Sequence, residues 1–406
     1  MTVLSAKVTV LFAFLASLGE AVPHGRKSTA KTAVGKAVYF ITNEAENAVV
    51  ALPIKNDGSL VKGNSIKTGG AGSNSIDGAT GQPAKPDALV GQSALTVVGN
   101  NIFAVNAGSN TLTMLSISPK DPTCLTVVGQ PVAIPGEFPT TVAASGKNNL
   151  VCVGTTGALA GISCATFSPK GLGQMDDLRP FNIGQSTPPV GPTNTVSHTF
   201  FSNDEMSLFT TVKGDPTVNN TGFLSTFKIN QDRCGASSLS TQDVRSSPNG
   251  TAVLFGSAPI PGNGNSLFVT DASFGAAILN VDQTGKATAA NLQPIEGQAA
   301  TCWSTISGAT QSAFVTDVAK NRVFEMSLKD ASIIKELDLS ANGDPGLIDL
   351  RSAGNFVYAL SPGNGTTSAA ITVLDVSGGQ GSAKQAQHFS LSGIAGSSSQ
   401  GMAVLV

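Results

Sequence analysis

Charged residues are scarce in this sequence. Asp, Glu, Lys and Arg make up 12% of the 406 residues, against about 25% in an ordinary soluble domain. The 24 basic and 26 acidic residues nearly cancel, and no stretch of the chain is strongly basic. A chain without concentrated positive charge lacks the electrostatic footprint of a protein that binds nucleic acid or an anionic membrane. We therefore expect neither as a partner.

Long hydrophobic runs are also missing. The longest, residues 8–18, is too short to span a bilayer. It follows Lys7 and is followed by Gly19-Glu20-Ala21, which has small residues at the positions that a signal peptidase needs, a pattern typical of a secretory signal. We therefore expect residues 1–21 to be removed and the protein to be extracellular, either free or associated with a cell wall, with no transmembrane segment.

The rest of the chain divides into an arm and one domain. Residues 22–36 are basic and small, without apolar periodicity, and predict a flexible arm. Residues 37–406 form the predicted domain. Three glycosylation sequons fall in its predicted loops, where a glycan would be tolerated. They begin at Asn219, Asn249 and Asn364.

Cysteine and histidine are few. The spacings of the five cysteines match no zinc pattern, so we expect neither a metal nor a cofactor. An odd number cannot all pair within the chain. Cys152 and Cys164 fall on successive strands of one predicted hairpin and are the first choice for a disulfide. The sequence leaves open whether Cys124, Cys234 and Cys302 stay reduced.

A repeated β-meander is what the chain does contain. Residues 93–117, SALTVVGNNIFAVNAGSNTLTMLSI, consist of three short apolar runs separated by Gly, Asn and Ser turns. The second and third runs recur, so that seven copies start at residues 37, 101, 149, 207, 266, 312 and 356. This spacing suits one four-stranded blade per repeat. The sequence therefore predicts an all-β, seven-bladed β-propeller.

The end of the chain predicts how the ring closes. Residues 400–406, QGMAVLV, resemble the first run of other repeats, but no second and third runs follow them. The copy that starts at Ala37 lacks a first run. We expect the C-terminal strand to join the N-terminal blade and so complete it.

A polar residue recurs where the first run of each repeat begins. The first runs are expected to be the innermost strands, so seven blades would gather these residues around one funnel. They are Gln92, Glu137, His198, Arg245, Gln298, Asp344 and Gln400. One interpretation is a pocket for a small polar ligand or a cell-surface partner at the channel mouth. The other is the solvated channel lining of any propeller.

Two residues stand out among the predicted inner strands. His198 is the only histidine there, and as a general acid or base it needs a partner that sets its charge and tautomer. Glu205 and Arg245 are the candidate partners, and a purely structural histidine is the alternative. Trp303, the only tryptophan, is either a platform for a ligand or part of the core.

The repeats resemble those of a known family. The segments FITNEAENAVVALPI from Phe40, FAVNAGSNTLTMLSI from Phe103 and FVTDASFGAAILNV from Phe268 resemble repeats of the lactonase type of seven-bladed propeller. That family includes 6-phosphogluconolactonase-like and fungal 3-carboxymuconate cyclase-like proteins. Enzymes of this family carry a P-H-x-H motif, and residues 195–198 of this chain keep one histidine at that place. They also carry Arg and Glu residues around the channel, for which Arg245 and Glu205 are the counterparts here.

The resemblance and the residues leave two hypotheses for function. The first is a secreted fungal protein of the antigen or adhesin type, a monomer that binds a ligand or partner without catalysis. The second is an enzyme that opens or closes a lactone ring. In the second, His198 moves a proton and Arg245 holds a carboxylate or the developing oxyanion.

Overall fold

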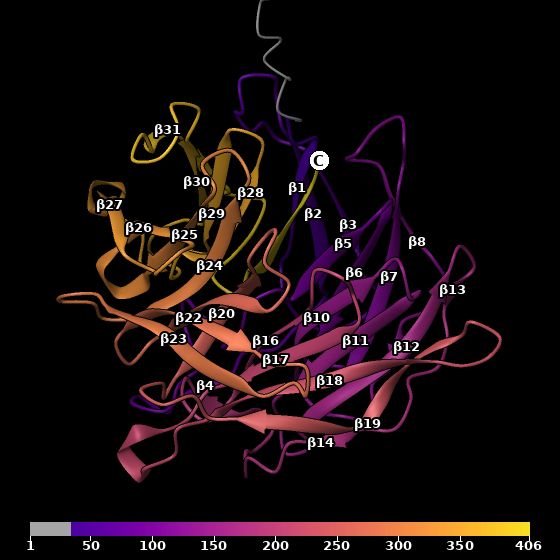
Figure 1. Cartoon of the computed structure of the whole chain (residues 1–406). Helices are drawn as coiled ribbons and strands as arrows, with labels where there is room; N and C mark the ends of the chain where they lie inside the picture. Colours follow the sequence, from indigo (N-terminus) through magenta and orange to yellow (C-terminus); the bar gives the residue numbers. More distant parts are fainter. Residues whose placement is uncertain (1–33) are drawn as a thin grey trace, which may run out of the picture. The chain divides into compact units, whose positions relative to one another are not determined.

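The computed structural model describes residues 34–406, which form seven blade sheets around a common channel and one small two-stranded sheet (Figure 1). The predicted all-β, seven-bladed propeller is confirmed. The predicted signal at 1–21 and most of the predicted arm at 22–36 lie outside the described residues. Within the described range, no helix has the length and apolar character needed to cross a membrane.

The first three blades contain four, five and five strands, and the first strand given for each lies nearest the channel. Blade 1 contains β32 (Gln400–Leu405), β1 (Ala37–Ile41), β2 (Ala48–Pro53) and β3 (Asn64–Lys67). Blade 2 contains β5 (Leu95–Val98), β6 (Asn101–Asn106), β7 (Thr111–Ile117), β8 (Leu125–Val127) and β9 (Val132–Ala133). Blade 3 contains β10 (Pro139–Ser145), β11 (Leu150–Thr155), β12 (Gly161–Ser168), β13 (Gly171–Leu172) and β14 (Arg179–Pro180).

The remaining four blades each contain four consecutive strands. Blade 4 contains β16 (Val196–Phe201), β17 (Ser207–Val212), β18 (Phe223–Gln231) and β19 (Ser237–Ser246). Blade 5 contains β20 (Leu254–Pro259), β21 (Ser266–Asp271), β22 (Gly275–Val281) and β23 (Ala287–Pro294). Blade 6 contains β24 (Thr301–Ser307), β25 (Ser312–Asp317), β26 (Arg322–Ser327) and β27 (Ile333–Asp338). Blade 7 contains β28 (Ile348–Ala353), β29 (Phe356–Ser361), β30 (Ala370–Asp375) and β31 (Lys384–Ser390).

Short elements lie in the connections. The loops carry three 3-10 turns, η1 (Pro216–Val218), η2 (Val318–Lys320) and η3 (Ser340–Asn342). Two long loops pair with each other through the parallel strands β4 (Ile76–Asp77) and β15 (Val190–Gly191). This pairing ties the loop that precedes blade 2 to the loop that precedes blade 4.

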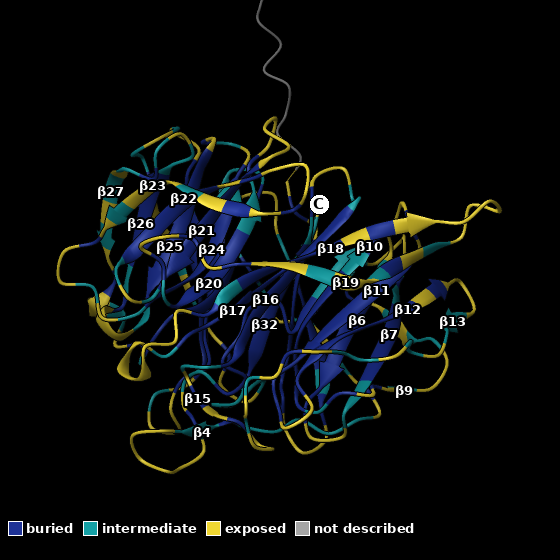
Figure 2. Ribbon diagram, turned by 60° about the horizontal axis from the view of Figure 1, so that its bottom comes forward, coloured by how far each residue is buried: buried dark blue, intermediate teal, exposed yellow. Residues whose placement is uncertain are grey.

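The apolar core lies between the blades rather than within them. A buried cluster fills the interface of blades 3 and 4, where Leu150 and Val196 belong to one set, and comparable clusters fill the other interfaces. The inner strands are buried and the outer strands are largely exposed (Figure 2). Because each blade buries its faces only against its neighbours, stability depends on completing the ring.

The ring closes as predicted. Strand β32 pairs antiparallel with β1, with Ala37 opposite Leu405 and Tyr39 opposite Ala403. Strand β32 also contacts the inner strands β28 and β5 of the two adjoining blades. The C-terminal strand is therefore the innermost strand of the N-terminal blade.

The inner strands share one irregularity. In six of the seven blades the pairing between the innermost strand and its neighbour shifts register at a bulge. Bulges bend a strand and increase its twist. Here each bulge lies at the beginning of its inner strand.

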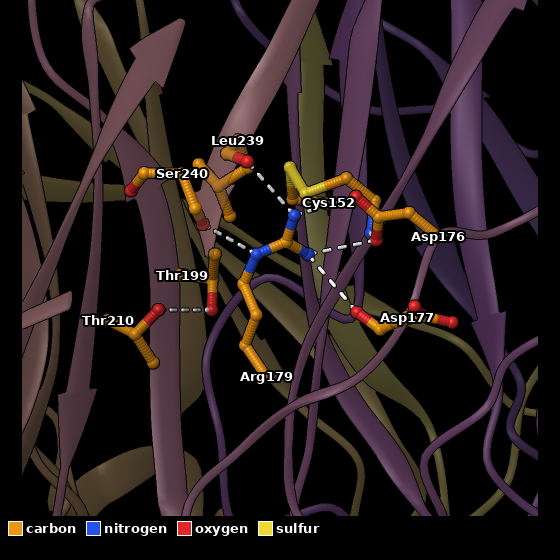
Figure 3. The surroundings of a disulfide bond; sticks show 9 residues. Cys152, Asp176, Asp177, Arg179, Thr199, Thr210, Leu239 and Ser240 are labelled. Atoms are coloured by element: carbon orange, nitrogen blue, oxygen red, sulfur yellow. Dashed lines mark hydrogen bonds and ion pairs between the residues drawn. A yellow bond between two sulfur atoms is a disulfide. The ribbon is translucent and has the colours of Figure 1, made fainter. Parts of the chain in front are cut away.

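A disulfide joins two strands of blade 3, and an arginine near it braces blade 3 against blade 4 (Figure 3). Cys152 and Cys164 lie opposite each other on β11 and β12 and are joined by a disulfide. Nearby, Arg179 binds both carboxylate oxygens of Asp176 at 2.9 Å and donates from Nε to the carbonyl of Ser240 at 2.7 Å. The bidentate geometry fixes the guanidinium while it holds the outer strand of blade 4.

The other cysteines and the sequons occupy the positions expected of loops and core. Cys124 and Cys234 are exposed with free thiols, and Cys302 is buried. The three sequon asparagines, Asn219, Asn249 and Asn364, are all exposed.

Deletion of residues 400–406 is expected to abolish cooperative unfolding of the domain. The deletion removes a strand of blade 1, exposes the edge of β1 and unpacks Met402, which is fully buried. The expected loss is about 5 kcal/mol or more, comparable with the whole stability of many domains. Thermal unfolding followed by circular dichroism measures it.

The control is deletion of Val406 alone, which lies outside β32 and is 52% exposed. Its expected effect is within about 0.5 kcal/mol, as for an ordinary surface change. An unchanged unfolding midpoint in the longer deletion would refute the role of β32 in closure.

Candidate functional site

The channel is filled by a segment of the chain itself. Residues 88–93, between the long loop and strand β5 of blade 2, are all buried. We call this segment the plug. It makes hydrogen bonds to four other blades, which is possible only if it crosses the channel.

The plug is joined to blades on opposite sides of the ring by hydrogen bonds that each involve a backbone group. From blade 6, Trp303 donates from Nε1 to the carbonyl of Gly91 at 3.2 Å. Gln92 pairs through its side-chain amide with both backbone groups of Ser304 in β24, at 2.8 and 3.1 Å, and donates from its backbone N to Ser197 of blade 4. Thr140 of blade 3 donates to the carbonyl of Leu89, the fifth such link.

The backbone of the plug is strained and closely packed. Val90 and Ser93 have φ of +51° and +66°, a left-handed conformation that is rare for a β-branched residue such as valine. Each such residue costs about 1–3 kcal/mol, which the surrounding hydrogen bonds must offset. Gly256 in β20 leaves room for the plug, because a Cβ there would lie 2.4 Å from Oε1 of Gln92.

His198 belongs to a polar cluster beneath the plug. Its Nε2 lies 2.9 Å from Oγ of Ser93, which also accepts a hydrogen bond from Arg351 at 2.6 Å. Arg351 pairs in turn with the buried Asp349 at 2.7 Å. The second carboxylate oxygen of Asp349 accepts from the backbone N of Ser93 and of Met402. The cluster therefore joins blade 4, the plug, blade 7 and the closing strand.

The surroundings of His198 define its charge and tautomer. Burial, and then the charge of Arg351, hold the pKa of His198 well below its usual value, so the ring is neutral. Its Nδ1 accepts a hydrogen bond from the backbone N of Ser257 at 3.3 Å, which assigns the proton to Nε2. His198 therefore donates to Ser93 and cannot take its proton, so the pair is not an activated serine nucleophile.

A cavity of about 320 Å³ lies beside the plug, between blades 4, 5 and 6. We call it the Lys213 cavity. Most of its walls are apolar, and two opposite charges face it. Its lining residues are Asp87, Pro192, Thr193, Lys213, Val253, Phe255, Ala272, Ala299, Ala300, Cys302, Trp303 and Val318. Its size falls within the range of sites for small ligands.

Lys213 supplies the positive charge. It is 2% exposed, and its Nζ donates to the carbonyl of Val90 in the plug at 2.5 Å. The ammonium also lies 4.4 Å from the centre of the Phe255 ring, a cation–π distance. Burial lowers the pKa of Lys213 to about 8, although the charge of Asp87 opposes the shift. Lys213 is therefore mostly protonated at pH 7.

Asp87 supplies the negative charge. Its Oδ1 accepts hydrogen bonds from the backbone N of Val90 at 2.9 Å and from Nε2 of Gln400 at 3.2 Å. Burial raises the pKa of Asp87 to about 6, against the lowering influence of Lys213. No ion pair within 4.0 Å joins Asp87 to Lys213 in the described part of the chain. The two groups thus face one cavity without neutralising each other by contact.

Three of the seven residues predicted for the funnel lie here, together with Trp303. Gln92 and His198 hold the plug, Trp303 lines the cavity, and Gln400 binds Asp87. All four are at least 95% buried. The structure therefore brings these widely separated polar residues together, but the plug fills the funnel that they were expected to line.

The predicted trio of His198, Glu205 and Arg245 is not brought together. Glu205 lies in the turn beyond β16 and accepts hydrogen bonds from Ser145 and Lys147 of blade 3. Arg245 lies on β19, three strands outward from β16, which is about 14 Å at the usual strand spacing.

Arg245 instead makes local contacts at the rim. Its Nε pairs with Asp243 at 2.9 Å, and its Nη2 donates to the carbonyl of Pro180 at 3.0 Å. It therefore contributes to the blade 3–4 interface.

The other three predicted residues also make local bonds. Glu137 accepts a hydrogen bond from Thr187, and Asp344 pairs with His388 at 3.1 Å. Gln298 donates to the carbonyl of Ala272 and accepts from the backbone N of Thr301, both at 2.9 Å. These side chains fix loops around the ring and are not among the lining residues of the Lys213 cavity.

Sequence reasoning missed Asp87, Lys213, Phe255 and Arg351. A signal for Lys213 existed, because blades 5 and 6 end their second strands with Asp271 and Asp317, which bind the backbone of the entering inner strand. Blade 4 has Val212-Lys213 at this place. Within residues 34–406, no group of three or more His, Cys, Asp and Glu side chains is arranged to hold a metal ion.

Comparison with known proteins identifies the fold. No protein-family model and no curated protein sequence matches this chain. Among solved structures, the periplasmic gluconolactonase PpgL of Pseudomonas aeruginosa is 14% identical with a TM-score of 0.64, over 91% of this chain and 99% of that one. A Bacteroides uniformis protein proposed to be a 6-phosphogluconolactonase is 13% identical with a TM-score of 0.53, over 70% of this chain and 80% of that one.

A third structure gives the same result. A functionally unknown protein of Desulfotomaculum acetoxidans is 13% identical with a TM-score of 0.57, over 91% of this chain and 99% of that one. At these identities the likeness concerns the fold. The chain has the fold of the lactonase-type seven-bladed propellers, as the resemblance of its repeats implies.

Replacing Gln92 with leucine is expected to lower the free energy of unfolding by about 2–4 kcal/mol, because Gln92→Leu leaves the buried N–H and C=O of Ser304 without partners. Denaturation in urea measures the change. The matched control is Gln298→Leu, which also removes two amide-to-backbone bonds but at a position that water reaches, so the expected loss is below about 1 kcal/mol. Equal losses in the two variants would contradict a bridging role for Gln92.

Proposed function

We propose that this chain hydrolyses a small lactone in the Lys213 cavity, and closes the same ring in the reverse direction. The observation that carries the proposal is the convergence of a buried ammonium, Lys213, and a carboxylate, Asp87, on one apolar cavity. The fold supports it, since the neighbour from Pseudomonas aeruginosa is named a gluconolactonase. Fold alone does not establish activity, so the proposal rests on the site.

Asp87 is the general base in this proposal. Its pKa of about 6 leaves it ionised at pH 7 yet basic enough to take a proton. It removes a proton from a water molecule whose oxygen attacks the ring carbonyl. When the acyl–oxygen bond of the ring breaks, Asp87 returns that proton to the leaving alkoxide. The product is a hydroxy acid in its carboxylate form, after loss of its acid proton to solvent.

Lys213 stabilises the negative charge that develops on the carbonyl oxygen. An ammonium carries three N–H donors. One binds Val90 and one side faces the Phe255 ring, which leaves a donor for the oxyanion. In a cavity with apolar walls such a fixed charge is worth more than in water. The carboxylate product then takes the place of the oxyanion.

These roles differ from the ones that the sequence suggests, which are proton transfer by His198 and stabilisation of the oxyanion by Arg245. The proposal assigns proton transfer to Asp87, because His198 donates its only proton to Ser93 and its Nδ1 is occupied. It assigns charge stabilisation to Lys213, because Arg245 is engaged at the rim.

A non-catalytic ligand-binding protein is the other hypothesis from the sequence. It predicts binding in the cavity without turnover, so the same experiments separate the two. Export, glycosylation at Asn219, Asn249 and Asn364, and a role at a fungal surface stay predictions from the sequence.

Loss of either charged group is expected to reduce lactone hydrolysis strongly. Lys213→Met removes the oxyanion donor and is expected to lower kcat about 100- to 1,000-fold. Asp87→Asn removes the base and is expected to lower kcat about 100-fold or more. Hydrolysis of uncharged lactones in a weakly buffered solution, followed by proton release, measures both.

Each variant has a matched control. Lys335 also donates its Nζ to a backbone carbonyl, that of Ala383, but lies on the outer strand β27. Asp344 is a buried carboxyl whose pKa, like that of Asp87, is raised by burial. Lys335→Met and Asp344→Asn are expected to keep kcat within about twofold of the wild type. Full activity in Lys213→Met or Asp87→Asn would remove this cavity from the reaction.

The pH dependence of kcat/KM is expected to be bell-shaped, with limbs near pH 6 and pH 8. Asp87 gains a proton as the pH falls through about 6 and no longer acts as a base. Lys213 loses its proton as the pH rises through about 8 and no longer stabilises the oxyanion. In Lys213→Met the alkaline limb should disappear. The acid limb should also move to higher pH, because the charge that lowers the pKa of Asp87 is gone.

The profile of residual activity in Lys213→Met decides the assignment. An unchanged alkaline limb in this variant would show that another group titrates there.

A further inference from the structure

The Lys213 cavity contains one positive charge, and this limits what it accepts. We infer that the substrate is an uncharged lactone with an apolar ring or chain, and that the product is its monocarboxylate. The inference rests on the proposed function and names the class of substrate. It separates this chain from an enzyme for phosphorylated or polyhydroxylated lactones.

The walls of the cavity carry few polar groups. Of the twelve lining residues, three have a charged or hydroxyl side chain, Asp87, Thr193 and Lys213. The indole N–H of Trp303 is already bonded to Gly91. Burying a hydroxyl without a partner costs about 1–3 kcal/mol in proteins. A sugar lactone would bury several hydroxyls without partners. An apolar ring would instead displace water and pack against alanine, valine and aromatic side chains.

A second anionic group would have no counter-charge. The product carboxylate takes the free donor of Lys213, and the other charged group on the wall is the carboxylate of Asp87. A phosphate or a second carboxylate would therefore be buried next to a like charge, which is strongly unfavourable. Lys85 lines a smaller adjoining cavity of about 110 Å³, which shares Asp87 and Pro192 with the Lys213 cavity. Lys85 is exposed and is not among the lining residues of the Lys213 cavity itself, so it does not provide the missing charge inside.

Two aromatic rings favour a flat apolar body. Phe255 and Trp303 pack edge to face with centroids 4.7 Å apart, and both line the cavity. An aromatic ring in the ligand extends this packing. Because Trp303 is the only tryptophan of the chain, its fluorescence reports directly on occupation of the cavity.

The experiment has a binding arm and a turnover arm. In the first, 3-phenylpropanoate and its neutral amide are titrated while tryptophan fluorescence is recorded. The expected result is saturable binding of the carboxylate, weakened at least about tenfold in Lys213→Met and unchanged in Lys335→Met, whereas the amide responds little to Lys213→Met. In the second, dihydrocoumarin, glucono-δ-lactone and 6-phosphoglucono-δ-lactone are compared, and dihydrocoumarin is expected to have the highest kcat/KM by about tenfold or more.

Ala300→Leu covers the case in which Lys213→Met does not fold. It keeps the lysine but fills the cavity at a lining residue, and it is expected to weaken both binding of 3-phenylpropanoate and hydrolysis of dihydrocoumarin at least about tenfold.

The outcomes distinguish the two proposals. Binding of 3-phenylpropanoate that depends on Lys213, without hydrolysis of any lactone, would overturn the proposed reaction while the ligand class stands. Preferred hydrolysis of either sugar lactone, lost in Lys213→Met, would support the reaction and overturn the substrate class. Neither binding nor hydrolysis would overturn both.

Discussion

The hydrogen bonds that hold the plug across the channel are the constraint on which this structure depends. The interfaces between blades are apolar, and apolar contacts do not fix direction. The plug adds directed bonds from blades 3, 4, 6 and 7 to consecutive residues of one segment. Its backbone is fully buried, so each of these groups needs a partner. The positions of the blades and of the plug therefore determine each other.

The cavity is a consequence of that arrangement. The carbonyl of Val90 can accept from Lys213 because the plug turns there through a left-handed residue. Asp87, three residues earlier, is held at the wall by the backbone of the same turn. Burying an ammonium and a carboxylate apart from each other is costly, and such arrangements concentrate at functional sites, where an unusual pKa serves the reaction. The short strained segment that orders the blades therefore also positions both charged groups of the cavity.

Much of the fold could be predicted from the sequence, because the strands of one blade lie close together in the sequence. Turn residues and alternation located the second strand of every blade, six at the same residue and one, β11, a single residue later. The missing first run at Ala37 identified the partner of the last strand.

The candidate site, in contrast, depends on how the loops fold. Arg245 shortly precedes an inner strand in the sequence but lies on β19, the outer strand of blade 4, which the loop at residues 247–253 connects to the inner strand of blade 5. Lys213 and Asp87 face the same cavity only because an insertion folds back into the channel. The periodicity of a sequence does not predict how such an insertion folds.

One contact of the closing strand links the order in which the chain is synthesised to the proposed site. Gln400, the first residue of β32, holds the carboxylate of Asp87, and β32 is made after every other blade. A ribosome-bound chain with all other strands already translated therefore still lacks a support of its proposed base. The proposed site is therefore complete only after the strand that closes blade 1 has paired with β1.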